Sequence, residues 1–198
     1  MKKYISMMAM ALTLSLGFTA CDVETDEEPG GTNIQNMCGY WDVSVSQVDE
    51  SGNVVWQPEE LFEIVDVPFY TYNTASNSST QMWIDDRGEF WDFKFLVNIN
   101  YSACTFTGEN VPYNSDMQEL ADAISAGSPV LDEDGSVVEP DLATISDAKI
   151  LLGQGHNIHG LPCDSISFYI SFTDDPYAAK YGYAKHHVSG VRHTGFTE

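Results

Sequence analysis

The stretch Trp91-Asp-Phe-Lys-Phe-Leu-Val-Asn-Ile-Asn-Tyr101 carries the strongest structural signal in this chain. Large apolar side chains occupy its odd positions, and polar side chains occupy its even positions, with Leu96 as the exception. Alternation with a period of two is typical of a β-strand that buries one face. A strand of this length favours a curled sheet, because barrel strands bend in this way.

Similar patterns recur along the chain. Strands are predicted at 41–46, 65–72, 81–85, 148–152, 165–173 and 186–194. Pro68 interrupts the second of these and favours an edge strand or a bent one. Together the runs predict an all-β protein, a closed antiparallel β-barrel of about eight strands or more with one short helix.

The predicted helix covers residues 115–126. Ser115 is a suitable N-cap, and Gln118 completes a capping box. Met117, Leu120 and Ile124 form an apolar stripe that we expect to pack on the barrel.

The N-terminus predicts export. Lys2 and Lys3 precede an apolar run that is too short to span a membrane and ends at Ala20, directly before Cys21. This anatomy resembles a bacterial lipoprotein signal, with Cys21 as the lipid anchor. Phe18 stands where lipoprotein signals usually have Leu. An ordinary secretory signal is therefore the alternative.

An acidic segment follows Cys21 and ends at Pro29-Gly-Gly31. Its composition predicts a flexible tether, and it resembles the surface-export signal of Bacteroidota lipoproteins. We therefore expect a signal peptide at 1–20, a tether at 21–36 and a barrel domain at 37–198. The expected location is the outer membrane, at the cell surface, with the membrane as a partner through the anchor.

The charge of the chain excludes one class of partner. The formal net charge is −22, and the six basic residues beyond the signal are scattered. Nucleic acid is not an expected partner, because binding phosphates needs clustered Lys and Arg. Cys38, Cys104 and Cys163 would permit one disulfide in an oxidising compartment, but no CxxC motif is present to suggest zinc.

Two residues far apart in the sequence suggest how the barrel closes. Gly39-Tyr40-Trp41 opens the first predicted strand, and Arg192 lies in the last. This pair resembles the lipocalin and calycin signature. The resemblance implies a lipocalin-like barrel in which the Trp41 ring plugs one end and Arg192 packs across it. A guanidinium over an indole face contributes roughly 0.5–2 kcal/mol.

Four further stretches extend the resemblance. They are Tyr70-Thr-Tyr-Asn-Thr-Ala75, Met82-Trp-Ile-Asp-Asp86, Asp164-Ser-Ile-Ser-Phe168 and Ser189-Gly-Val-Arg-His-Thr-Gly-Phe196. They are similar to the Bacteroidota lipoprotein family labelled "lipid-binding putative hydrolase". That family has a lipocalin-like barrel, so the resemblance implies the same fold here.

A small hydrophobic ligand, such as a fatty acyl chain, is the first expected partner. Apolar faces of two predicted strands could line its cavity, through Trp91, Phe93, Phe95, Val97, Phe168 and Ile170. A filled core would show the same pattern, so both possibilities stay open. The second hypothesis is a glycan- or protein-binding surface built from the exposed aromatic residues Trp56, Tyr70, Tyr72 and Trp83.

Hydrolysis is the third and weakest hypothesis. The chain has no G-x-S-x-G motif. His156 and His159 lie in a Gly-rich loop that favours no metal site, and Asp85-Asp86 lies in a predicted turn rather than an acid–base pair. We therefore assign no catalytic residue, metal ligand or cofactor.

Overall fold

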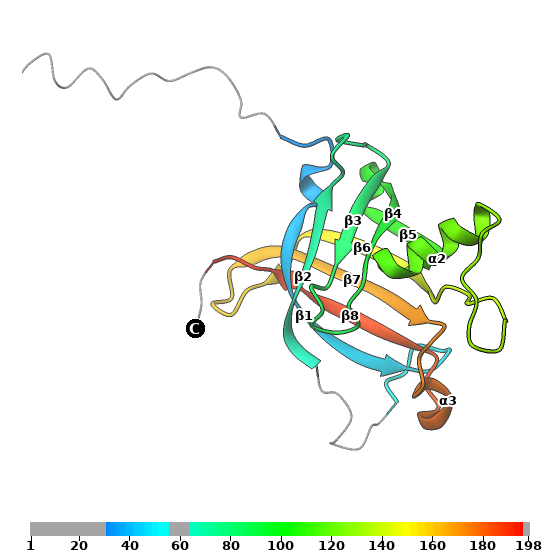
Figure 1. Cartoon of the computed structure of the whole chain (residues 1–198). Coiled ribbons are helices and arrows are strands. Elements are labelled where there is room, and N and C mark those ends of the chain that lie inside the picture. The colour runs from blue at the N-terminus through cyan, green and yellow to red at the C-terminus, as the bar shows by residue number, and fades with distance from the viewer. Residues whose placement is uncertain (1–30, 56–63, 196–198) are drawn as a thin grey trace, which may run out of the picture. The chain divides into compact units, whose positions relative to one another are not determined.

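Eight antiparallel strands form the closed barrel that the sequence predicts (Figure 1). The computed structural model describes residues 31–55 and 64–195, and its compact unit begins at Thr32. The strands are β1 (Gly39–Val48), β2 (Ile64–Asn73), β3 (Gln81–Asp85), β4 (Lys94–Asn100), β5 (Thr105–Pro112), β6 (Leu142–His156), β7 (Pro162–Phe172) and β8 (Lys185–Arg192).

Each strand pairs with the next one along the chain, and β8 returns to pair with β1. β2 is therefore hydrogen-bonded on both sides, so of the two alternatives predicted at Pro68 the edge strand is wrong and the bent strand remains. The irregularity expected from proline lies instead in the β1–β2 register, which shifts between Val43 and Val45. Gly190 allows β8 to approach β1, because a Cβ there would overlap the carbonyl oxygen of Asp42.

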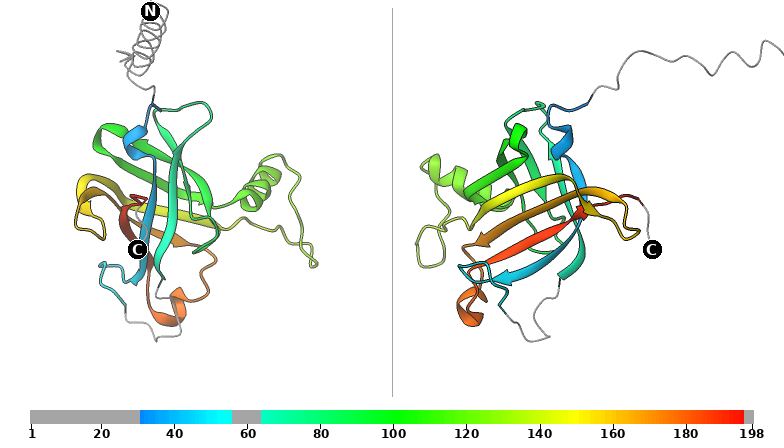
Figure 2. Two further views of the ribbon diagram at one scale, coloured as in Figure 1. Left: turned by 90° about the vertical axis from the view of Figure 1, so that its left-hand side faces the viewer. Right: turned by 180° about the vertical axis from the view of Figure 1, so that it is seen from behind.

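The helices are few and short, and they lie outside the barrel wall (Figure 2). They are the 3₁₀ turns η1 (Gln35–Met37) and η2 (Tyr101–Ala103), and the α-helices α2 (Ser115–Ser125) and α3 (Ala178–Tyr181). No helix among the described residues is long and apolar enough to cross a membrane.

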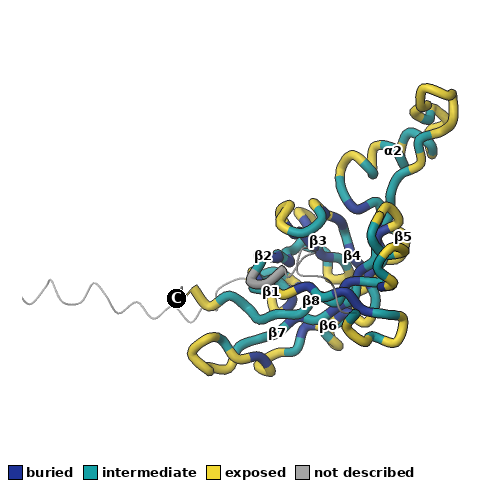
Figure 3. The backbone as a smooth tube through the Cα atoms, turned by 90° about the horizontal axis from the view of Figure 1, so that it is seen from below, coloured by how far each residue is buried: buried dark blue, intermediate teal, exposed yellow. Residues whose placement is uncertain are grey.

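The helix α2 lies where the sequence predicts it, but its cap and its packing differ. Asn114 rather than Ser115 is the N-cap, and its side chain accepts a hydrogen bond from the Met117 N–H. Only Met117 packs against the barrel core, and no residue of α2 is fully buried. The exposed segment beyond the helix holds a single antiparallel bridge, Leu131 to Val137 (Figure 3).

The strand register defines two ends of the barrel. The plugged end is where β1 begins and β8 finishes, next to η1. The loop end is where β1 finishes, and the connections 86–93, 113–141 and 173–184 lie there. The three cysteines of the barrel, Cys38, Cys104 and Cys163, are free thiols, so the disulfide that the sequence would permit is not formed.

Candidate functional site

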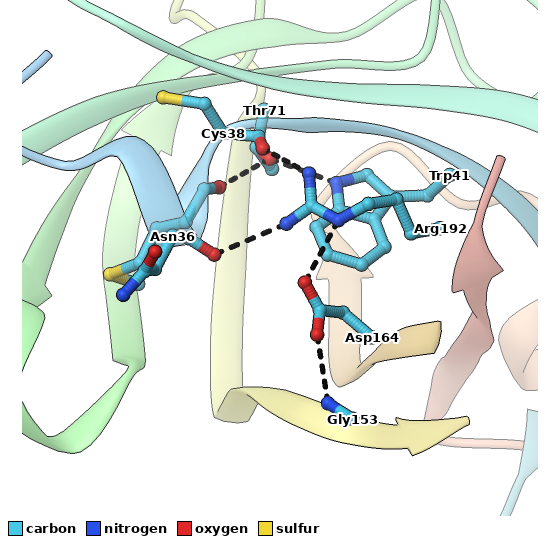
Figure 4. A network of polar contacts seen from close by, with 8 residues as sticks. Asn36, Cys38, Trp41, Thr71, Gly153, Asp164 and Arg192 are labelled. Carbon is cyan, nitrogen blue, oxygen red and sulfur yellow. Dashed lines mark hydrogen bonds and ion pairs between the residues drawn. The ribbon is translucent and has the colours of Figure 1, made fainter. Parts of the chain in front are cut away.

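The plugged end brings Trp41 and Arg192 together (Figure 4). Gly39 lies next to both side chains. Trp41 is opposite Arg192 in the β1–β8 register, and it is completely buried. The central carbon of the Arg192 guanidinium lies 4.5 Å from the centroid of the Trp41 ring. The cation therefore covers the indole face and ties the first strand to the last.

The guanidinium also binds three oxygens from two other parts of the fold. Its Nε donates to Asp164 at 2.9 Å, and its terminal nitrogens donate to the carbonyl oxygens of Cys38 and Asn36. Asp164 in turn accepts the Gly153 N–H at 2.8 Å. Arg192 thus joins the segment around η1 to β7 and, through Asp164, to β6.

The indole N–H completes the plug from the inner side. It donates to the Thr71 hydroxyl at 2.8 Å, and that hydroxyl donates to the Met37 carbonyl oxygen at 2.6 Å. Ile34 and Met37 are fully buried, so the segment before β1 contributes to the core although Ile34 falls within the expected tether. These contacts give this end of the barrel a structural role.

The residues expected to line a ligand cavity lie on the inner face of the barrel. Phe93, Phe95 and Val97 are at most 2 % exposed, and Phe168 and Ile170 are fully buried. Trp91 differs, because it is half-buried and precedes β4, which begins at Lys94. The predicted strand is therefore shorter at its start than its alternation suggests.

Aromatic rings form a continuous wall from the interior to the loop end. The Phe69 and Phe93 centroids are 5.5 Å apart, and Phe93 lies 6.1 Å from Phe172. Phe172 stacks on Trp91 at 4.5 Å with an interplanar angle of 6°. Because Trp91 is partly exposed, this aromatic wall reaches the surface at the loop end.

A buried carboxylate fixes the loop that carries Trp91. Asp86 accepts backbone N–H groups of the loop residues Gly88, Phe90, Trp91, Asp92 and Phe93. Burial raises the pKa of Asp86, and these N–H groups oppose the change by stabilising the charged form. Asp86 therefore organises the turn, while its neighbour Asp85 accepts the Tyr72 hydroxyl.

A second buried carboxylate lies in the β7–β8 connection and binds the only fully buried histidine. Asp175 lies 3.0 Å from Nε2 of His186, whose side chain is 2 % exposed. Asp175 also accepts the Tyr183 hydroxyl and the N–H groups of Tyr177 and Ala178. Burial lowers the pKa of His186 despite the carboxylate beside it.

Nδ1 of His186 is buried without a hydrogen-bond partner, the single such side-chain atom in the described part of the chain. The rings of Phe90, Tyr183 and Trp91 surround the imidazole, with centroids 5.0, 5.2 and 5.7 Å away. His186 and Asp175 are not among the site residues predicted from the sequence. The available signal was the position of His186 two residues before inward-facing Val188, which puts both on one strand face.

The outer face of the barrel holds a different feature. A cleft of about 470 Å³ is lined by Trp83, Asp92, Lys94, Asn114, Ser115 and Asp116. The Lys94 ammonium lies 5.6 Å from the Trp83 ring centroid and 5.8 Å from that of Tyr72. Tyr70 lies two residues before Tyr72 in β2 and stacks on Tyr40. Trp56 falls outside the described residues.

The remaining histidines do not assemble a metal centre. Among residues 31–55 and 64–195, no cluster of three or more His, Cys, Asp or Glu side chains could hold a metal ion. His187 contacts the Ser167 hydroxyl at 3.0 Å, and His193 contacts Asp42 at 2.9 Å.

Comparison with known proteins places this barrel in a family. Residues 26–197 match the model of the family described as "Lipid-binding putative hydrolase". The chain belongs to that family. The match covers the whole barrel, so the Trp41–Arg192 plug, the aromatic wall and His186 all lie within the lipid-binding putative hydrolase region. A search of curated proteins found no match.

Proposed function

We propose that this protein binds one small hydrophobic molecule, such as a fatty acyl chain, along the aromatic wall of its barrel. The single observation that carries the proposal is the continuity of that wall from buried Phe69 to half-exposed Trp91. Because the plugged end is tied by Arg192, the ligand enters at the loop end. Membership of a lipid-binding family supports the same ligand class.

Titration with a fluorescent fatty-acyl probe tests this proposal. Phe93→Asp places a carboxylate on the wall and should abolish saturable binding, because an unpaired charge in an apolar site is costly. Asn98→Asp adds the same charge on the exposed face of the same strand and should leave binding unchanged. Absence of saturable binding by the folded wild-type protein would reject the proposal.

A second variant separates a ligand cavity from a filled core. Val97→Phe enlarges a buried side chain on the same face of β4 as Phe95. If space for a ligand lies beside Val97, the new ring fills it, and probe binding falls while the protein stays stable. If the core is filled there, the same change costs roughly 1–3 kcal/mol of stability. Urea unfolding and probe titration on one preparation distinguish the two.

We also propose that Cys21 carries a lipid that anchors the protein to the outer membrane, with the barrel at the cell surface. The apolar run that ends at Ala20 and the acidic tether after Cys21 support this proposal. Cys21→Ser should move the protein from the membrane fraction to the soluble fraction and stop incorporation of labelled palmitate. The anchor would be contradicted if Cys21→Ser stays in the membrane fraction and the wild-type protein takes up no labelled palmitate.

Recognition of a glycan is the second candidate function, and the outer cleft favours it. Trp83 offers a ring for stacking, and the carboxylates, amide and hydroxyl around it can bind sugar hydroxyls. A glycan-array signal that Trp83→Ala abolishes, and that Phe93→Asp leaves intact, would support this function. A signal that Trp83→Ala leaves unchanged would place the glycan elsewhere.

A further inference from the structure

The buried pair His186 and Asp175 restricts the chemistry of the molecule that the barrel can hold. Asp175 accepts its other hydrogen bonds from three donors, which are the N–H groups of Tyr177 and Ala178 and the hydroxyl of Tyr183. A carboxylate saturated in this way only accepts hydrogen bonds. His186 must therefore donate through Nε2–H.

The position of that proton fixes the role of the second ring nitrogen. In a neutral imidazole with its proton on Nε2, Nδ1 carries a lone pair and can only accept a hydrogen bond. Burial favours the neutral form, since it lowers the pKa of His186. No described residue supplies a donor to Nδ1, and an unpaired buried acceptor costs roughly 1–3 kcal/mol.

The imidazole also lies beside the aromatic wall. Trp91 and Phe172, which stack on each other, have ring centroids 5.7 and 6.1 Å from that of His186. The polar end of an amphiphile whose chain follows the wall would therefore lie beside the His186 imidazole.

We propose that Nδ1 of His186 accepts a hydrogen bond from the head of the bound molecule, and that the site selects hydroxyl-headed neutral lipids over fatty-acid anions. A fatty alcohol or a monoacylglycerol supplies the missing donor. A carboxylate supplies only lone pairs, which would face the lone pair of Nδ1. This inference rests on the proposed lipid-binding function and adds the head-group class.

The test compares hexadecanol and palmitate as competitors of a fluorescent acyl probe on the purified protein at about pH 8, where an ordinary histidine is neutral. We expect hexadecanol to bind about tenfold more tightly, which is what one hydrogen bond to a buried group contributes. His186→Phe keeps a ring of similar size and should remove the difference. His187→Phe is the matched control, because His187 is the next residue and contacts Ser167 instead.

Asp175→Asn supplies a second, opposite result. The Asn oxygen can keep the bonds to the Tyr177 and Ala178 N–H groups, while its amide N–H₂ takes the position that faces His186. The imidazole must then accept at Nε2 and carry its proton on Nδ1. Nδ1 becomes a donor, so the preference should shift toward palmitate. Melting curves of each variant show whether it is folded.

The outcomes separate this inference from the proposed function. If the folded wild-type protein binds no probe, lipid binding itself fails. If it binds the probe but hexadecanol and palmitate compete equally, lipid binding stands and the head-group selection is overturned, with water the partner of Nδ1. A preference for hexadecanol that survives in His186→Phe would also overturn it.

Discussion

At the scale of single residues, a few side chains fix the geometry of the barrel because each serves several elements. Arg192 covers Trp41 and binds oxygens of Cys38, Asn36 and Asp164. Asp86 likewise holds the loop that carries Trp91, because its carboxylate accepts hydrogen bonds from backbone N–H groups of that loop. Substitutions at such positions should therefore disturb parts of the fold that are far apart in the sequence.

Gly39 offers a direct test of the plug. A Cβ at this position would lie 2.6 Å from a terminal nitrogen of Arg192 and 3.0 Å from the Trp41 ring. Gly39→Ala should displace the guanidinium and cost roughly 1–3 kcal/mol of unfolding free energy, measured in urea.

Gly108→Ala is the matched control for that measurement, because its nearest atoms would lie 3.4–3.5 Å away, at ordinary contact distance. It should change stability much less than Gly39→Ala. Equal losses in the two variants would mean that the guanidinium moves aside freely, and that the plug does not depend on a glycine before Trp41.

His186 should make stability depend on pH. Burial holds its pKa below the ordinary value, so the folded protein keeps it neutral while the unfolded chain binds a proton below about pH 6.5. Its contribution is complete above that pH and is lost as the pH falls toward the lower folded pKa. We expect urea stability to drop as the pH falls below about 6.5, and to drop less in His186→Phe. An unchanged slope in that variant would show that folding does not shift the pKa of His186.

At the scale of elements, the sequence predicts the strands better than the segments between them. Alternation in β4, β7 and β8 follows directly from burial of one face, so a local pattern reveals it. The start of β4 could not be read in this way. Trp91 continues the alternation, but Asp92 has a positive φ of 60° and Asp86 takes the loop N–H groups.

The same contrast between strands and connections holds for the functional residues. Trp41 and Arg192 could be paired through their resemblance to the lipocalin signature, whereas the contact of Asp175 with His186 depends on how the β7–β8 connection folds back. The N-cap was misplaced by one residue because Asn114 and Ser115 are both good caps, and only the backbone geometry distinguishes them.

The segment that contains α2 should be dispensable for the barrel. Pro112 and Leu142 are paired neighbours in β5 and β6, so a short turn can join the strands directly. Met117 is the residue of α2 that packs against the core. Replacing residues 114–140 with a two-residue Asn-Gly turn should cost less than about 2 kcal/mol. Circular dichroism and urea unfolding check this, and loss of the barrel signal would show that the segment is structural.

At the scale of the whole molecule, the barrel is asymmetric. One end is tied by Arg192 and filled by Trp41, Ile34 and Met37. The other end carries long connections, a half-exposed aromatic stack and a buried polar group with an unused lone pair. This asymmetry is why we propose that a ligand enters at the loop end.

The most direct test is native mass spectrometry of the purified protein after it has been mixed with acyl lipids. We predict a species heavier than the protein by one lipid molecule, absent in Phe93→Asp and retained in Asn98→Asp. A spectrum in which the folded wild-type protein carries no lipid, or carries it equally in Phe93→Asp, would contradict binding inside the barrel.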